Sequence, residues 1–437
     1  MPAFSRMGVL RVKRHTSPAL DLGGIIPDVA LPSSSALSLR SAHGALVTAL
    51  ARPLNSIYSA LPTTVFETMS QLARVHEAVN LGQGFPEDPG PEDVRLKAAE
   101  AVVNGWNQYP SMLGMPELRQ AAATHFRHWQ GLELNPDTEI MVTSGATEAL
   151  AVSLLALIEP GDEVVLFQPL YDAYLPLVER AGGIARLVRL EPPHWHITQE
   201  KLAAVFSDRT KLVLLNNPQN PTGVVHSRAE LELVAQFCQR FDAYAVCDDV
   251  WEHIVFDGRS FTPLMALEGM RERTVKISSA GKIFGMTGWK VGMMFAAAPL
   301  MKVLSRAHQF LTFTTPPCLQ TAVAYGLGKD DAYFATMRAG LQRARDRLTD
   351  GLTSLGFDVL PSAGTYFLNI DLSSRFAAPD DEAFCRVLVE QHGVAAIPVS
   401  AFYAQDAVRS VVRLCFAKSD TTLDLALERL SRAAKVL

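Results

Sequence analysis

The chain has 437 residues, of which 48% are hydrophobic and 19% are charged. This length and composition are typical of a globular protein with two domains, or with one large domain and an appendage, each with its own core. The formal net charge of −5 provides no basic field of the kind that nucleic-acid-binding proteins use. We therefore expect no nucleic-acid partner.

The cysteines and the apolar runs exclude two further classes of protein. The five cysteines show no C-x-x-C spacing, so we predict neither a disulfide framework nor a metal site. A reducing compartment is expected for such a protein. No apolar run reaches the roughly 18 residues that a membrane span needs. We therefore predict a cytoplasmic protein without a membrane partner.

Residues 1–59 differ from the rest of the chain. Their first fourteen residues carry Arg6, Arg11, Lys13 and Arg14 without an acidic residue, and serine and alanine are frequent after them. This composition suits an organelle-import signal. A disordered arm and a start codon placed too far upstream explain it equally, so all three readings stay open.

Helical and strand-like segments alternate from about residue 94 onward. The hydrophobic patterns predict helices over 91–106, 146–162 and 227–241, and strands over 139–145, 163–169, 210–218 and 243–249. Ser227 and Glu230 form a capping-box pattern at the start of the third helix. Nearly continuous apolar strands between helices predict an α/β fold with a mainly parallel sheet covered on both faces.

Polar residues gather where these strands end, which is where parallel sheets bind ligands. The segment 143–150 passes from strand to helix through Gly145, so the N–H groups of Ala146 and Thr147 form a candidate anion site. Asn217 and Asn220 lie in a proline-stiffened loop and serve either as ligand contacts or as turn caps. Asp248 and Asp249 follow an apolar strand, and a carboxylate there needs a cationic partner.

Two lysines lie among small residues in the segment 278–292. Lys282 in such a turn can act as an amine that forms a Schiff base with a carbonyl, and Lys290 can neutralise an anion. Together with the acid, the asparagine and the anion site, these lysines describe a site for pyridoxal phosphate.

The chain resembles the fold-type I pyridoxal phosphate enzymes of the class I/II aminotransferases, nearest to the kynurenine aminotransferase, glutamine transaminase K and methionine aminotransferase branch. The resemblance covers about residue 60 to the end. It rests on VNLGQGFPEDPGP (79–91), NQYPSMLGMPELR (107–119), NNPQNPTG (216–223), SSAGKIFGMTGWKVG (278–292), GTYFLNID (364–371) and VAAIPVSAFY (394–403).

This resemblance implies a role for each site residue. Lys282 and Asp248 are the implied catalytic residues: Lys282 forms the Schiff base and moves the substrate proton, and Asp248 pairs with the pyridinium nitrogen. The other implied cofactor contacts are Asn220 and Trp251 toward the 3-oxygen, Tyr171 against the ring, Ala146, Thr147, Ser279 and Lys290 at the phosphate, and Tyr109 from a neighbouring subunit. The implied substrate contacts are Gly84, Asn220, Arg413 and Phe313.

One residue departs from the family's pattern. Trp251 stands where the family has a tyrosine, and its indole N–H can donate a hydrogen bond but cannot accept one. The aromatic wall that the resemblance assigns to Phe313 suits a neutral or aromatic side chain better than a dicarboxylate.

The resemblance implies a homodimeric aminotransferase that moves an amino group from such an amino acid to a 2-oxo acid by a ping-pong mechanism. Two alternatives use the same fold, namely a cysteine-S-conjugate β-lyase and a non-catalytic sensor protein. The expected domains are an extension (1–59), an arm with a small-domain segment (60–93), a large cofactor-binding domain with a seven-stranded sheet (94–334) and a small α+β domain (335–437).

Overall fold

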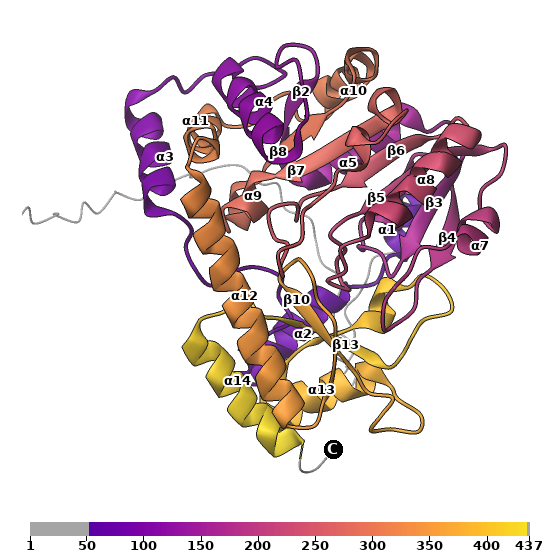
Figure 1. Cartoon of the computed structure of the whole chain (residues 1–437), viewed down its shortest axis with the longest axis vertical. Coiled ribbons are helices and arrows are strands. Elements are labelled where there is room, and N and C mark those ends of the chain that lie inside the picture. Colours follow the sequence, from indigo (N-terminus) through magenta and orange to yellow (C-terminus); the bar gives the residue numbers. More distant parts are fainter. Residues whose placement is uncertain (1–51, 435–437) are drawn as a thin grey trace, which may run out of the picture. The chain divides into compact units, whose positions relative to one another are not determined.

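The computed structural model describes residues 52–434, and its main element is a seven-stranded sheet with the order β2-β8-β7-β6-β5-β3-β4 (Figure 1). Its strands are β2 (Ile140–Ser144), β3 (Glu163–Gln168), β4 (Ile184–Arg189), β5 (Thr210–Asn216), β6 (Tyr244–Asp248), β7 (Thr274–Ser279) and β8 (Val291–Phe295). Strand β8 runs antiparallel to both of its neighbours, and the other neighbouring pairs are parallel. Six strands therefore point the same way, and their carboxyl ends share one edge.

Helices cover both faces of this sheet because alternate residues of each strand face opposite cores. In β3, Val164 and Leu166 belong to the core that contains α5 (Gly145–Leu157) and α6 (Tyr174–Arg180), whereas Val165 and Phe167 belong to the core that contains α8 (Arg228–Arg240). Every residue of β3 is buried. The predicted parallel sheet with two covered faces is confirmed.

The predicted helices agree with the observed ones, with shifts at their ends. The capping box at α8 is present, with the Ser227 side chain accepting from the N–H of Glu230. Helix α5 ends at Leu157, before the predicted end at residue 162, because Ile158 is extended and Pro160 follows it.

A second sheet is built from the C-terminal part of the chain. It has four strands in the order β12 (Ile397–Pro398), β13 (Val411–Cys415), β10 (Phe367–Asp371) and β9 (Asp358–Leu360), all antiparallel. Helices α12 (Asp331–Ser354), α13 (Asp381–His392) and α14 (Asp420–Ala433) accompany it. Strand β1 (Val79–Asn80) pairs with β11 (Val394–Ala395), so the segment after helix α2 (Val65–Val75) joins this C-terminal part.

The remaining elements connect and cover these sheets. They are the helices α1 (Ser56–Ala60), α3 (Glu92–Asn104), α4 (Pro116–Gln130), α7 (Gln199–Ala203), α9 (Ala280–Ile283), α10 (Ala298–Leu311) and α11 (Pro317–Leu327), with the 3-10 turns η1 (Leu264–Ala266), η2 (Arg271–Arg273), η3 (Thr287–Trp289) and η4 (Val399–Phe402). Within residues 52–434, no helix is both long and apolar enough to cross a membrane.

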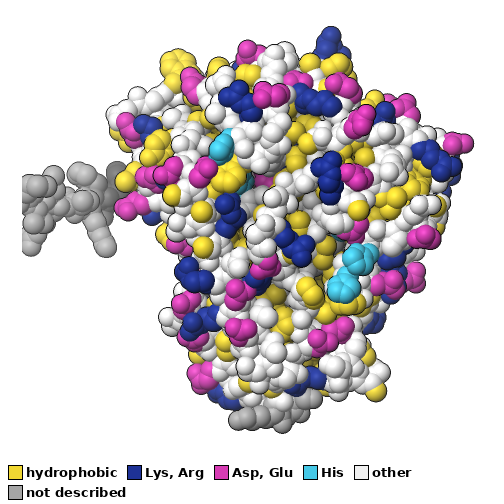
Figure 2. Space-filling view, viewed as in Figure 1, with side chains coloured by type: hydrophobic (Ala, Val, Ile, Leu, Met, Phe, Trp, Pro, Cys, Tyr) yellow, Lys and Arg dark blue, Asp and Glu magenta, His cyan; other side chains and the backbone are white. Residues whose placement is uncertain are grey.

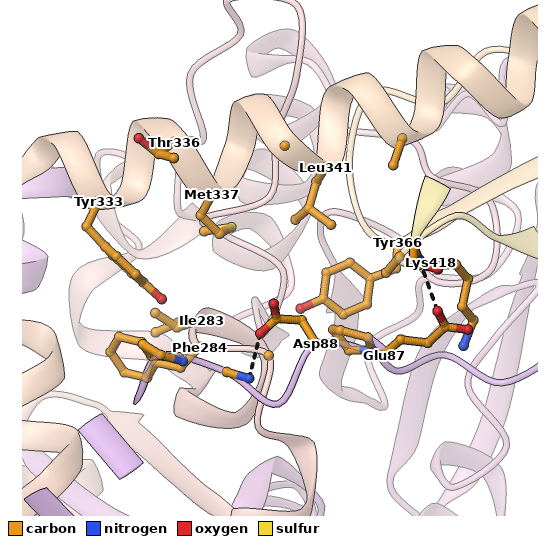
Figure 3. Close-up of a pocket in the computed structure, with 18 of the residues that line it drawn as sticks. Glu87, Asp88, Ile283, Phe284, Tyr333, Thr336, Met337, Leu341, Tyr366 and Lys418 are labelled. Carbon is orange, nitrogen blue, oxygen red and sulfur yellow. Dashed lines mark hydrogen bonds between the residues drawn. The ribbon is translucent and has the colours of Figure 1, made fainter. Parts of the chain in front are cut away.

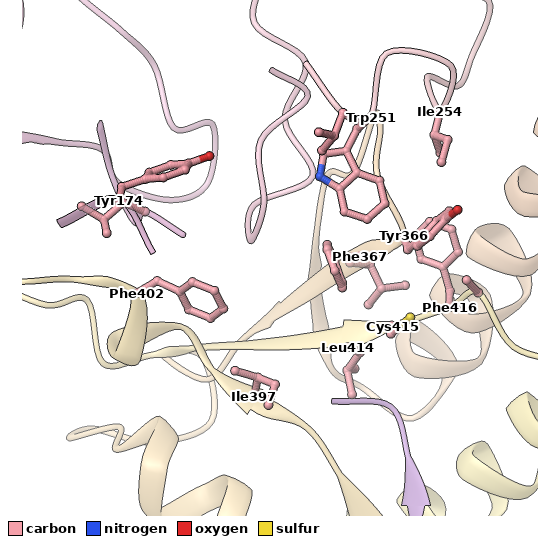
Figure 4. Packing of buried hydrophobic residues seen from close by; sticks show 14 of the residues in the cluster. Tyr174, Trp251, Ile254, Tyr366, Phe367, Ile397, Phe402, Leu414, Cys415 and Phe416 are labelled. Carbon is pink, nitrogen blue, oxygen red and sulfur yellow. The ribbon is translucent and has the colours of Figure 1, made fainter. Parts of the chain in front are cut away.

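The two sheets share one hydrophobic core, which includes Val246 of β6 and Leu368 of β10. At their junction the Trp251 ring meets the edges of Tyr366 and Phe367, with centroid distances of 4.7 and 5.6 Å (Figure 4). Residues Leu54–Leu437 form one compact unit. The division into domains at 94 and 335 therefore stays a prediction.

Residues 1–51 lie outside the described residues, and with them most of the predicted N-terminal extension. Within its range of 1–59, the segment that begins at Ser56 forms helix α1. On the face of the described residues shown in Figure 2, basic and acidic side chains are interspersed.

Candidate active site

A cavity of about 200 Å³ opens at the carboxyl edge of the large sheet. It brings together residues that follow β2, β3, β5, β6 and β7. The predicted site residues that line it are Ala146, Thr147, Tyr171, Asn220, Asp248, Trp251, Ser279, Lys282 and Lys290.

Asp248 is held at the end of β6 with one oxygen engaged and one free. The Tyr174 hydroxyl donates to Oδ2 at 2.5 Å, while Oδ1 is buried without a hydrogen-bond partner. Burial raises the pKa of the Asp248 carboxyl, and the Tyr174 hydrogen bond opposes that shift. A buried acceptor without a partner is costly, so Oδ1 is suited to a donor brought by a ligand.

The neighbouring Asp249 has a different role. The Lys276 ammonium lies 3.0 Å from Asp249 Oδ2 and also bonds Glu252, and all three side chains are buried. Asp249 therefore has the cationic partner that a buried carboxylate needs. Of the two acids, only Asp248 faces the cavity.

Lys282 lies in the turn after β7, in helix α9. Burial lowers the pKa of its amine to about 8. Its Nζ lies 4.4 Å from the Trp251 ring centroid and 3.5 Å from the carbonyl oxygen of Gly84. An amine with this pKa is partly neutral near pH 7.5 and is therefore a usable nucleophile and base.

An anion-binding corner forms where β2 and β8 lie side by side. Gly145 adopts a left-handed φ of +70° at the start of α5, and a Cβ placed there would lie 3.5 Å from Lys290 Nζ. The lysine ammonium thus lies beside the helix N-terminus, where Ala146 and Thr147 line the cavity together with Ser279. Backbone N–H groups, a hydroxyl and an ammonium together suit a phosphate.

Arg413 lies beside the cavity rather than in its lining. It is 1% exposed on β13, and its guanidinium donates to Asn220 Oδ1 at 2.8 Å and to Gly82 O at 2.7 Å. Burial lowers its pKa to about 9. The Phe367 ring lies 4.0 Å from the guanidinium carbon.

Gly84 lies against the same phenyl ring. A Cβ at Gly84 would come within 2.6 Å of the Phe367 ring, so only glycine allows this close approach. Gly84 and Arg413 thus both contact the Phe367 ring, and Arg413 in turn bonds Asn220.

Four predicted residues lie outside the cavity lining: Gly84 and Arg413, described above, and the exposed Tyr109 and Phe313. Tyr109 is 80% exposed and Phe313 is 39% exposed, and their rings meet edge to face at 5.6 Å. Phe310 nearby is 84% exposed. Tyr109 and Phe313 therefore face outward in a single subunit, and the structure leaves their predicted roles untested.

A larger groove of about 920 Å³ lies between α12 and the segment 86–91 (Figure 3). Tyr333, Met337 and Leu341 of α12 point into it, and it contains neither Asp248 nor Lys282. The Tyr366 hydroxyl on its wall donates to the carbonyl oxygen of Lys282 at 2.9 Å. The chemistry at the strand ends places the candidate active site in the smaller cavity.

Tyr174 and Asn216 also line the cavity and were not predicted from the sequence. Asn216 donates to the carbonyl oxygen of Asp248 at 2.6 Å and accepts the N–H of Asn220 at 2.8 Å. Asn216 and its neighbour Asn217 end a strand, which was a usable signal. Tyr174 follows Tyr171 by three residues in the short segment after β3, and the two ring centroids lie 5.6 Å apart.

Residues 76–430 match the family Aminotransferase class I and II. The chain belongs to the class I and II aminotransferases. It is therefore an aminotransferase, of a family that depends in general on pyridoxal phosphate. The predicted family, fold class and enzyme class are confirmed.

Named relatives of this aminotransferase cover most of its length. The methionine aminotransferase of Escherichia coli (strain K12) is 40% identical over 370 residues, which is 85% of this chain and 96% of that protein. Kynurenine–oxoglutarate transaminase 1 of Homo sapiens is 36% identical over 396 residues, 83% of this chain and 94% of its own.

A solved structure supports the fold of this aminotransferase. The structure of N-succinyldiaminopimelate aminotransferase from Mycobacterium tuberculosis superposes with a TM-score of 0.84 at 42% identity, covering 87% of this chain and 100% of that one. The β-lyase and sensor alternatives gain no support from these relatives.

Proposed function

We propose that this aminotransferase binds pyridoxal phosphate in the cavity at the strand ends and accepts neutral or aromatic amino acids as amino donors. The observation that carries the proposal is the combination of three groups around one cavity. These are the free buried Oδ1 of Asp248, the Lys282 amine with a pKa lowered to about 8, and the corner formed by Lys290 and the start of α5.

The residues present fit the cofactor. The unpartnered Oδ1 of Asp248 would accept from the protonated pyridine nitrogen, and Tyr171 would lie along the ring. Asn220 and Trp251 would donate to the 3-oxygen. The phosphate would bind to Ala146, Thr147, Ser279 and Lys290.

Pyridoxal phosphate, when bound, supplies a carbonyl carbon for amine exchange and a ring that accepts electrons. The protein supplies the proton transfers. With its lowered pKa, the Lys282 Nζ accepts the proton of the substrate α-carbon near neutral pH. Asp248 keeps the pyridine nitrogen protonated through its free oxygen, while Tyr174 fixes the carboxylate.

Arg413 would bind the substrate carboxylate. Its two Nη atoms now donate to uncharged acceptors, and a carboxylate makes stronger, charge-assisted bonds with a guanidinium. Asn220 accepts a hydrogen bond from Arg413 and also lines the cavity. It would therefore contact both the residue that binds the substrate carboxylate and the cofactor.

Support for the substrate class comes from two relatives and from the aromatic wall that the resemblance assigns to Phe313, whose ring would offer apolar surface for the substrate side chain. The relatives named for methionine and for kynurenine cover more than four-fifths of this chain. The relative named for N-succinyldiaminopimelate makes that compound the competing donor to test.

A homodimer with shared sites completes the proposal. Tyr109, Phe313 and Phe310 are exposed on the described subunit, and exposed aromatic residues are typical of protein interfaces. Tyr109 would reach the phosphate of the neighbouring subunit, and Phe313 would form part of the wall around its substrate.

The test of the proposed function is an absorbance titration. We expect purified protein supplied with pyridoxal phosphate to show a cofactor band that bleaches on addition of methionine. The Lys282→Ala variant should bind the cofactor without this amine-dependent change. A wild-type protein with no cofactor band would contradict the proposal.

The donor class is tested by comparing initial rates at one 2-oxo acid concentration. Methionine, glutamine, kynurenine and phenylalanine should be better donors than aspartate. Faster turnover of aspartate or of N-succinyldiaminopimelate would overturn the assignment of a neutral or aromatic donor.

A further inference from the structure

A buried ion pair lies behind the anion-binding corner and outside the cavity lining. Glu148 belongs to the beginning of α5, and His308 lies near the end of α10. Glu148 is 9% exposed and His308 is 0% exposed. The reaction outlined above uses neither residue, so their burial needs another explanation.

His308 bridges two acceptors. Its Nδ1 lies 2.6 Å from Glu148 Oε1, and its Nε2 lies 3.0 Å from the carbonyl oxygen of Met112. A carboxylate oxygen and a carbonyl oxygen carry no hydrogen, so both ring nitrogens must donate. The ring therefore carries the positive charge that balances Glu148.

Glu148 in turn holds the turn that begins α5. Its Oε2 accepts the N–H of Ser144, the residue before Gly145. Burial by itself would raise the pKa of the Glu148 carboxyl, but hydrogen bonds from His308 and Ser144 lower it below its usual value. The Glu148 carboxylate thus belongs to the same first turn of α5 as the N–H groups of Ala146 and Thr147.

A negative charge at this place has two opposite effects. Its hydrogen bond fixes the Ser144–Gly145 turn, which presents the N–H groups to the cavity. Its field opposes an anion at the same helix start. With a glutamate at this position, a compensating positive charge allows the hydrogen bond without the repulsion.

We propose that Glu148 and His308 act together as positioning residues for phosphate: Glu148 holds the turn in shape, and His308 neutralises the Glu148 charge that would otherwise repel the cofactor phosphate. This inference rests on the proposed cofactor. It assigns a function to a pair that touches neither cofactor nor substrate.

The pair also connects the phosphate corner with the exposed aromatic residues. The carbonyl oxygen of His308 accepts the N–H groups of Thr312 and Phe313, each at 3.1 Å. Phe313 contacts Tyr109. His308 therefore contributes its side chain to the phosphate corner and its backbone carbonyl to the segment that carries Phe313.

The experiment compares the affinities of apoprotein for pyridoxal phosphate and for pyridoxal, which lacks the phosphate. The dissociation constant for pyridoxal divided by that for pyridoxal phosphate measures the phosphate contribution, and both constants are read from tryptophan fluorescence, without turnover. We expect His308→Gln to lower this ratio about tenfold, equivalent to about 1.4 kcal/mol. The double variant Glu148→Gln/His308→Gln should recover most of the loss, because glutamine still accepts from Ser144 but carries no charge.

Two further variants separate this role from simple loss of stability. Glu148→Gln alone should keep or increase the ratio. If His308→Gln does not fold, this variant alone tests the proposed role of the Glu148 charge. His125→Gln is the matched control, because His125 is another buried histidine, bonded to the carbonyl oxygen of Leu327 at 3.0 Å and outside the cavity lining. It should lower the melting temperature and leave the ratio unchanged.

The outcomes distinguish the two proposals. A wild-type protein that binds both compounds equally well would contradict the proposed phosphate site itself. If the wild type prefers pyridoxal phosphate, an unchanged ratio in His308→Gln overturns the inference. An equal loss in the double variant, or a loss in Glu148→Gln, overturns it as well.

Discussion

Asp248 is held by a residue from a distant part of the chain. Its Oδ2 accepts from Tyr174, which lies 74 positions earlier, and its other oxygen stays free. The bond to Tyr174 holds the carboxylate at the cavity wall while Oδ1 has no hydrogen-bond partner. Tyr174 therefore orients the acid that the proposed function assigns to the pyridine nitrogen.

Tyr174→Phe tests this orientation. The variant removes one hydroxyl and leaves the ring, so we expect kcat/KM to fall by about 10- to 100-fold, because hydrogen bonds to charged groups contribute roughly 1.5–3 kcal/mol. The measurement is steady-state kinetics with methionine as donor.

Tyr403→Phe is the matched control. It removes a hydroxyl that donates to the carbonyl oxygen of Leu190 at 2.7 Å, and neither residue lines the cavity. Its kinetics should match the wild type. If both variants show the same kinetics, Tyr174 does not position Asp248.

The Lys282 amine provides a prediction of pH dependence. Its pKa is lowered to about 8 by burial, so the neutral amine is present at lower pH than in an ordinary lysine, whose pKa is about 10.4. In apoprotein, acylation of Lys282 followed by peptide mass spectrometry should increase through about pH 8 and level off above it. An increase that begins only near pH 10 would contradict the lowered pKa.

At the scale of elements, the active site depends on how closely β8 approaches the start of α5. Thr143 of β2 lies opposite Gly292 of β8 in the sheet register. A Cβ at Gly292 would come within 2.5 Å of the Gly145 backbone and 2.6 Å of the Thr143 hydroxyl. A side chain there must push β8 away from the corner that contains Lys290.

Gly292→Ala should therefore destabilise the protein and weaken cofactor binding. We expect a loss of about 1–3 kcal/mol in the free energy of unfolding, as overpacked cores show, together with a higher dissociation constant for pyridoxal phosphate. Denaturant unfolding of apoprotein and a fluorescence titration measure the two effects.

Gly340→Ala in α12 is the control in which an added methyl group should stabilise the protein. No heavy atom lies within 4 Å of a Cβ at Gly340, and alanine is favoured over glycine in a helix by about 1 kcal/mol. This variant should be more stable than the wild type. A Gly292→Ala protein as stable as Gly340→Ala would show that the close packing of β8 against the turn is unimportant.

At the scale of the whole molecule, the proposed dimer makes a prediction about mixed subunits. If Tyr109 acts in the partner's site, a dimer of one Lys282→Ala and one Tyr109→Ala subunit has one site with both changes and one site with neither. An equal mixture of the two variants, refolded together, should regain about a quarter of the wild-type activity.

The inactive parents are the baseline for this experiment. Each variant refolded alone should show only its own residual activity, and size-exclusion chromatography should give a dimer in all cases. A mixture no more active than the mean of its parents would place Tyr109 in the site of its own subunit.

Four of the seven strands of the large sheet (β2, β3, β5 and β6) and the helices α3, α5 and α8 could be predicted because their signals are local. The apolar runs of β3, β5 and β6 and the capping box of α8 are each contained in a few neighbouring residues. The strands β4, β7 and β8 were not predicted. Strand β4 lies at the sheet edge and only Val188 in it is buried, which leaves a weak apolar pattern.

The residues at the strand ends were also predictable, because parallel strands place their carboxyl ends at one edge. Lys282, Asp248 and Asn220 each follow a strand, and the structure collects them around one cavity. Arg413 was assigned by resemblance alone, since a single arginine in a strand has no local signal for its partner.

The sequence by itself determined the family, the α/β class and the residue types at the site, because periodicity, turn residues and motifs are short-range properties of a chain. Only the tertiary structure decided which groups meet. Arg413 bonds Asn220 across 193 positions, and His308 bonds Glu148 across 160. Such pairs depend on strand order and register, which follow from the packing of the whole sheet and are not encoded in any single segment.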